Sequence, residues 1–148
     1  MMDLAKTNLL GAVTSLFILT LCILIFTSRL MNRPTAEYWL GFTFLMCALP
    51  LIYLFLTASG LKKPAIYSIQ LGCMLAFMAA ELLLDYVLKI DFRAVRWMVI
   101  LYVMLFFAGT GGLIGIAAGA GRWWGIAAII LYLAIAVLAF VQRIITGQ

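Results

Sequence analysis

Five long, mostly apolar stretches limit what this chain can fold into. They cover residues 7–28, 38–61, 64–88, 97–121 and 123–142, and each holds 20 to 25 residues. A helix of about 20 apolar residues spans the hydrocarbon core of a bilayer, so each stretch is long enough to cross it once. Transmembrane β-strands need segments of about 10 residues that alternate in polarity, and these stretches do not alternate. The sequence therefore predicts five transmembrane helices.

The segments between these stretches are short. The longest runs from 29 to 37, and two of the others have only one or two residues. Short connections place successive helices side by side and antiparallel. The predicted fold class is therefore an all-α integral membrane protein, a compact antiparallel bundle of about five transmembrane helices with short loops, in which residues 1–148 form a single domain. Pro50 falls within the second stretch, where its missing N–H group predicts a kink.

Composition excludes several classes of protein. The chain is 68% hydrophobic and 10% charged, whereas a soluble domain is about 25% charged. It has no histidine, which excludes Ser-His and Cys-His nucleophiles, His-ligated zinc and axial-His haem. Cys22, Cys47 and Cys73 lie in separate stretches without the C-x-x-C spacing of a redox or metal site. We therefore expect no enzymatic activity, no metal and no cofactor.

The positive charge of the chain favours a membrane over nucleic acid as its partner. The net charge is +5, and the Lys and Arg residues stand singly or in pairs at the ends of the apolar stretches, as interfacial anchors do. Alternate connections carry four of them (Lys6, Lys62, Lys63, Arg122) against six (Arg29, Arg33, Lys89, Arg93, Arg96, Arg143). Because cytoplasmic loops carry more Lys and Arg, we expect a cell-membrane location with the N-terminus outside and the C-terminus in the cytoplasm.

Two acidic residues interrupt the third stretch. Glu81 lies five residues beyond its midpoint, roughly 7.5 Å along a helix, and Asp85 lies nearer the hydrocarbon edge. Insertion of an ionised side chain at a helix centre costs about 2.5–3.5 kcal/mol, so Glu81 should face the bundle interior, be protonated or be paired. Two carboxyl groups one turn apart also hinder each other's ionisation, which suits proton or cation binding. Glu81 and Asp85 are therefore candidate ligand-binding or ion-binding residues.

The same face of this predicted helix offers partners in both directions. Lys89 and Arg93 continue the four-residue spacing and are expected electrostatic partners of the carboxylates, so a structural salt ladder is an alternative interpretation. In the other direction, steps of four, three and four residues lead from Gln70 through Met74 and Phe77 to Glu81. Gln70 is therefore a further candidate ligand-binding residue on a narrow path, although an amide near the interface needs no such role.

The fourth stretch contains a glycine pattern. Gly111, Gly115 and Gly119 form a doubled G-x-x-x-G, which allows a neighbouring helix backbone to approach closely. We expect these glycines to serve helix packing. The alternative is an unwound segment whose free amide groups bind a ligand, as in some transporters.

Two functional hypotheses follow. In the first, the chain is a small multipass protein that binds or conducts a proton, a small cation or a small molecule through its carboxylate-containing bundle, as a transporter does. In the second, it is a non-catalytic membrane interaction or assembly subunit whose glycine-rich helix packs against a second copy or another membrane protein. The position of Glu81, in a wet cavity or sealed against basic side chains, distinguishes the two.

Overall fold

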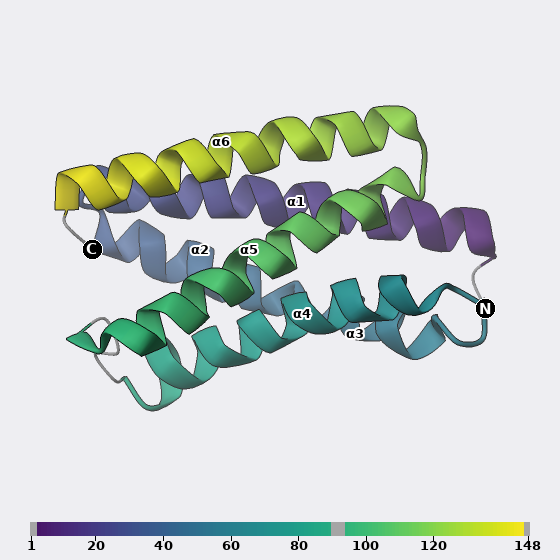
Figure 1. The fold of residues 1–148 in the computed structure, drawn as a ribbon, viewed down its shortest axis with the longest axis horizontal. Coiled ribbons are helices and arrows are strands. Elements are labelled where there is room, and N and C mark those ends of the chain that lie inside the picture. Colours follow the sequence, from purple (N-terminus) through teal and green to yellow (C-terminus); the bar gives the residue numbers. More distant parts are fainter. Residues whose placement is uncertain (1–2, 90–93, 147–148) are drawn as a thin grey trace.

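The computed structural model describes residues 3–89 and 94–146, and within these ranges the chain is helical without strands (Figure 1). The helices are α1 (Leu4–Leu30), α2 (Pro34–Met46), α3 (Ala48–Thr57), α4 (Ala65–Glu81), the π-helix η1 (Leu82–Val87), α5 (Arg96–Ala118) and α6 (Arg122–Thr146). Since α2 continues into α3 and α4 into η1, the described residues form five helices long and apolar enough to cross a membrane. The predicted bundle of five long apolar helices is confirmed.

The helix boundaries differ from the predicted ones by a few residues. The first helix is longer at both ends because Asp3 caps it, accepting a hydrogen bond of 2.8 Å from the backbone N–H of Lys6. The second begins at Pro34 instead of residue 38. Proline suits the first position of a helix because its fixed φ is helical and the N–H it lacks has no partner there.

Helix α1 lies at the centre of the arrangement. It packs against α2, α3, α5 and α6, while α4 packs against α5 and α3. The first turn of α1 and the last turn of α6 lie at opposite ends of the bundle (Figure 1). Consecutive spans therefore alternate in direction, as their short connections predict.

The second span is interrupted at Cys47, between α2 and α3. Pro50 has no N–H group to donate to the carbonyl of Met46, so the hydrogen-bond ladder of the helix cannot continue unbroken there. Cys47, the residue between the two helices, lies three residues ahead of the proline, and the predicted kink stays a prediction. Beside the break is an open apolar groove of about 260 Å³ against α1, lined by Val13, Thr14, Phe17, Thr43, Met46, Cys47 and Pro50.

An aromatic cluster fills the core between four helices. Phe77 of α4 is its centre, with ring centroids 5.1 Å from Phe106, 5.1 Å from Tyr102 and 6.0 Å from Phe44. Phe26 of α1 completes it, at 5.8 Å from Phe106 in an edge-to-face arrangement. Such ring pairs add stability beyond the area they bury. The cluster therefore fixes α1, α2, α4 and α5 next to the acidic residues of α4 and η1.

Glycines of α5 allow it to approach α4 closely. A Cβ atom added at Gly109 would lie 3.1 Å from Cα of Met74, and one added at Gly112 would lie 3.3 Å from Cα of Gln70. At Gly115 it would lie 2.5 Å from Nε2 of Gln70, the end of a flexible side chain. Backbone atoms of α4 therefore occupy the space that larger side chains on α5 would need.

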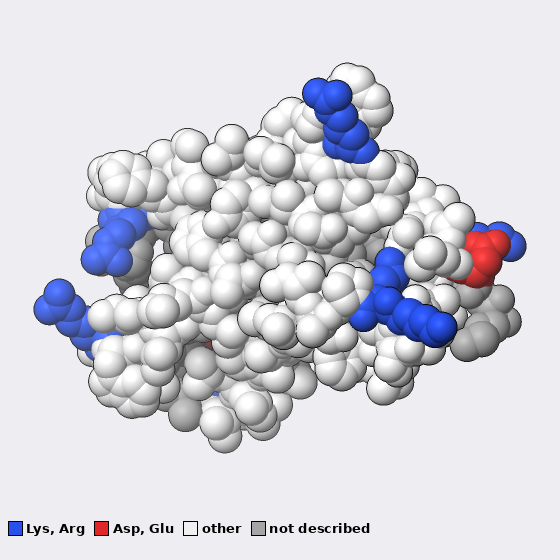
Figure 2. Space-filling view, turned by 45° about the vertical axis from the view of Figure 1, so that its right-hand side comes forward, with Lys and Arg blue, Asp and Glu red and all other residues white. Residues whose placement is uncertain are grey.

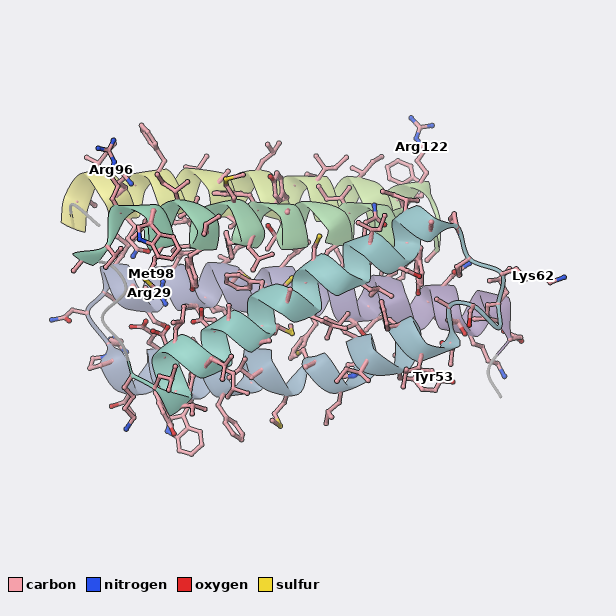
Figure 3. All side chains as sticks on the ribbon, turned by 60° about the horizontal axis from the view of Figure 1, so that its bottom comes forward. Arg29, Tyr53, Lys62, Arg96, Met98 and Arg122 are labelled. Carbon is pink, nitrogen blue, oxygen red and sulfur yellow. The ribbon has the colours of Figure 1, made fainter. Side chains whose placement is uncertain are left out.

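The outer surface of the bundle is apolar. Large side chains such as Leu56, Phe140 and Trp123 are 71%, 66% and 78% exposed. On the face that Figure 2 shows, Lys and Arg side chains lie toward the two ends, and the band between them is uncharged. Figure 3 places Arg29 and Arg96 at one end of the bundle and Lys62 and Arg122 at the other. This distribution matches a protein surrounded by lipid.

Candidate functional site

Glu81 is the last residue of α4, and its side chain is half-buried against α5. The hydroxyl group of Tyr102 on α5 donates a hydrogen bond to Oε2 of Glu81. The Tyr102 ring packs on Phe77, so the aromatic cluster holds the hydroxyl group in place. A donor fixed in this way stabilises negative charge on Glu81 without a full counter-charge. The structure thus places Glu81 at a helix contact with one defined partner.

Arg29, in the last turn of α1, lies beside this contact. Its Nε is 2.5 Å from Oε1 of Glu37 on α2, and its guanidinium carbon is 5.8 Å from the ring centroid of Phe26. Its side chain is 21% exposed, and its charge also acts on Glu81 and Tyr102. Arg29 therefore lies within electrostatic reach of carboxylates on two different helices.

The π-helix η1 begins directly after Glu81 and carries Asp85. Asp85 lies close enough to Glu81 for the two carboxyl groups to interact. A hydrogen bond between two carboxyl groups requires a proton on one of them, because ionised carboxylates only accept. Glu81, Asp85, Tyr102, Arg29 and Glu37 are hereafter called the polar cluster. Short π-helical turns occur often at functional sites.

Tyr86, next to Asp85, connects η1 to α2. Its hydroxyl group donates a hydrogen bond of 3.2 Å to the backbone carbonyl of Tyr38, and the two rings have centroids 5.5 Å apart. Gly41 leaves room for this hydroxyl group, since a Cβ there would lie 2.3 Å from Oη of Tyr86. The contact fixes the position of η1, and hence of Asp85, relative to α2.

The predicted ladder of charges along one α-helical face is corrected by the structure. The ladder requires a regular α-helix from Glu81 to Arg93, but η1 has π-helical geometry from residue 82 to 87. Lys89 lies beyond the end of η1, exposed and in a left-handed backbone conformation with φ of 51°. Arg93 lies outside the described residues. Among the described residues, the cation that acts on Glu81 is Arg29, from a different helix.

Gln70 lies away from the polar cluster. Eleven residues separate it from Glu81, roughly 16 Å along the helix axis. Between them, Met74 is fully buried and Phe77 is 3% exposed, so packed side chains occupy the predicted path. The amide of Gln70 instead lies against Gly115 of α5, and the base of its side chain lies against Gly112.

The three glycines of the predicted packing face contact three different helices. A Cβ at Gly111 would lie 3.7 Å from the ring of Tyr132 on α6, and one at Gly119 would lie 3.8 Å from Asn8 on α1. Gly115 faces Gln70 on α4. Gly111 is half-buried, whereas Gly115 and Gly119 are exposed, so the chain's own helices cover the glycine pattern only in part.

Sequence reasoning missed Arg29, Glu37 and Tyr102 as members of the polar cluster. Arg29 and Glu37 stand at the ends of predicted spans, where charged residues are usual. Tyr102 did carry a signal, because a tyrosine inside an apolar helix needs a hydrogen-bond partner for its hydroxyl group. The nearest carboxylate is on the preceding span, and only tertiary packing shows that the two meet.

A second polar contact lies near the start of α4. Lys63, in the loop before α4, donates from Nζ to Oδ1 of Asn8 on α1, and Nζ lies 4.8 Å from the ring centroid of Tyr67. Partial burial lowers the pKa of Lys63 from its ordinary value. This contact attaches the loop to α1.

No family model, curated protein or solved structure matches the chain. What the polar cluster is able to do chemically therefore follows from its own side chains. Within the described residues, no three His, Cys, Asp or Glu side chains are grouped as a metal site requires. What the cluster offers is a carboxyl pair, a phenol donor and a guanidinium group, which together suit the binding and release of a proton.

Proposed function

We propose that this chain is a multipass integral membrane protein that reversibly binds a proton or a small monovalent cation at the Glu81–Asp85 carboxyl pair. Its five long apolar helices and their exposed apolar surfaces support insertion into a bilayer. The proposed location is the cell membrane, with the end that carries Arg29 and Arg96 in the cytoplasm. This orientation leaves the N-terminus outside.

The observation that carries the proposed function is the position of Glu81. It is a half-buried acid in a proposed membrane span, with a second carboxyl group and a phenol donor on it. Ionisable residues at such positions are expensive to insert and mark ion or proton sites in membrane proteins. The alternative of an assembly subunit rested on a glycine face open to a partner. In the structure Gly111, Gly115 and Gly119 neighbour three different helices of the chain, and Gly115 and Gly119 are exposed, so this alternative keeps an exposed surface.

Reconstituted vesicles test this proposal. Purified protein in vesicles that contain a pH-sensitive dye should carry protons or monovalent cations across the bilayer, and infrared spectra should show a carboxyl group that titrates. Glu81→Gln should abolish the transport and remove the Glu81 contribution from the infrared titration, because the amide keeps the shape of the side chain but does not titrate. Asp85→Asn should weaken them. Asp3→Asn is the matched control, since Asn also caps helices well and residue 3 lies outside the polar cluster.

Two results would contradict the proposal. One is a wild-type protein whose vesicles stay tight to protons, sodium and potassium and whose infrared spectra show no titrating carboxyl group within the bundle. The other is an infrared titration that is the same in the wild type and in Glu81→Gln.

A further inference from the structure

Arg29 is placed to do more than join α1 to α2. Its Nε contacts Glu37, but a guanidinium group has five N–H donors, so donors remain for a second carboxylate. Its charge acts on Glu81 and Tyr102 as well. The side chain is largely buried beside the ring of Phe26, where water screens its charge less than at the surface. The carboxyl pair is thus permanently close to one fixed positive charge.

We infer that Arg29 makes the polar cluster selective for protons over alkali cations. This inference rests on the proposed function and names the ligand that it takes. A proton forms a covalent O–H bond with one carboxyl group, and a neighbouring carboxylate such as that of Asp85 is able to accept a hydrogen bond from it. A sodium or potassium ion keeps its full charge and needs several oxygen ligands. It would meet repulsion from Arg29 and compete with the Tyr102 hydroxyl group for Oε2 of Glu81.

Among the described residues, the charged and titratable groups that act on Glu81 or on its neighbours come from four elements. They are Cys22 and Arg29 of α1, Glu37 and Tyr38 of α2, Asp85 and Tyr86 of η1, and Tyr102 of α5. Arg29 is the only one of these groups that is cationic. The Arg29 charge acts on both Glu37 and the carboxyl pair. Removing one of these partners should therefore change the electrostatic effect of Arg29 on the other.

Two substitutions that break the same ion pair should therefore act in opposite directions. Arg29→Gln removes the positive charge that opposes protonation, so the infrared titration midpoint of the carboxyl pair should move to higher pH, by about one pH unit or more. Glu37→Gln leaves Arg29 without its partner and free to turn toward Glu81, so the midpoint should move to lower pH. A purely structural ion pair would give the two variants the same loss of stability and no opposite shifts.

Alkali ions provide the test of selectivity. In the wild type, adding sodium or potassium chloride instead of choline chloride should leave the titration midpoint unchanged. In Arg29→Gln, the alkali ions should compete with the proton and lower the midpoint. Arg29→Lys keeps the charge and should restore insensitivity to alkali ions. If Arg29→Gln does not fold, Glu37→Gln and Arg29→Lys still test the direction of the shift and the role of charge.

The outcomes separate this inference from the proposed function. Shifts in the same direction for Arg29→Gln and Glu37→Gln, or a wild-type midpoint that already responds to sodium, would overturn the inference while the titrating carboxyl pair remains. An infrared titration that Glu81→Gln leaves unchanged would overturn the proposed function itself. Opposite shifts together with alkali sensitivity only in Arg29→Gln would support both.

Discussion

The hydroxyl group of Tyr102 on α5 donates a hydrogen bond to Oε2 of Glu81 on α4, beside the ring of Phe77. Tyr102→Phe removes this donor and should lower the free energy of unfolding in detergent by about 0.6–1.7 kcal/mol, as for other hydrogen bonds between transmembrane helices. Tyr132→Phe on α6 is the matched control and should cost less. Equal losses in the two variants would show that the Tyr102 bond contributes nothing specific.

Close approach of α4 to α5 depends on Gly109. Gly109→Ala places a methyl group 3.1 Å from Cα and 3.0 Å from Sδ of Met74, and the backbone atom has no alternative rotamer. Gly111→Ala meets only the ring of Tyr132 at 3.7 Å, an ordinary contact, and gains about 0.8–1.0 kcal/mol of helix propensity. Thermal unfolding in detergent should show that Gly109→Ala is destabilised relative to Gly111→Ala. The reverse order would mean that the two helices separate easily.

Gly41 and Tyr86 should show strong coupling. Gly41→Ala places a methyl group 2.3 Å from Oη of Tyr86 and should displace the tyrosine from the Tyr38 carbonyl. Tyr86→Phe removes the atom in conflict, and the next ring atom is 3.5 Å away. The double variant should therefore be more stable than Gly41→Ala alone. Additive losses in unfolding measurements would contradict this steric account.

The orientation in the membrane should respond to small changes in charge. Reporter tags should place the N-terminus outside and the C-terminus in the cytoplasm, because six Lys and Arg residues lie on the proposed inner side and four on the outer side. Replacing exposed Arg33 and Arg96 with Gln removes this excess and should give mixed orientations. Replacing exposed Lys62 and Arg122 with Gln enlarges the excess and should leave the orientation unchanged. Both termini on one side would contradict the count of five spans.

The helices were predictable because each is specified locally. A run of apolar residues long enough to cross a bilayer can be recognised without knowledge of the rest of the fold. The interruption near Pro50 follows from one missing N–H group. The predicted ends were less accurate, since caps such as Asp3 and Pro34 extend the helices beyond the uncharged runs.

The partners of Glu81 were not predictable in the same way. The sequence alone marks Glu81 as unusual, because it is an acidic residue within an apolar run. Arg29 and Tyr102, however, reach it from other helices. The spacing of Lys89 from Glu81 assumed a regular α-helix, and nothing in the apolar residues 82–84 indicates a π-helix. The glycine pattern likewise predicted close packing but not that its members face different neighbours. The partners of Glu81, the π-helix after it and the neighbours of the glycines all depend on the tertiary arrangement.

The interruption at Cys47 divides the second span into two halves that share α1 as a neighbour. α2 also contacts Tyr86 of η1 and Phe77 of α4, and α3 also packs on α4. The same span thus borders the polar cluster through Glu37 and reaches α4 again near the opposite end of the bundle. A rotation of α2 about Cys47 would move Glu37 relative to Arg29, so the residues just ahead of Pro50 join the half of the span that bears the charge to the half that packs on α4.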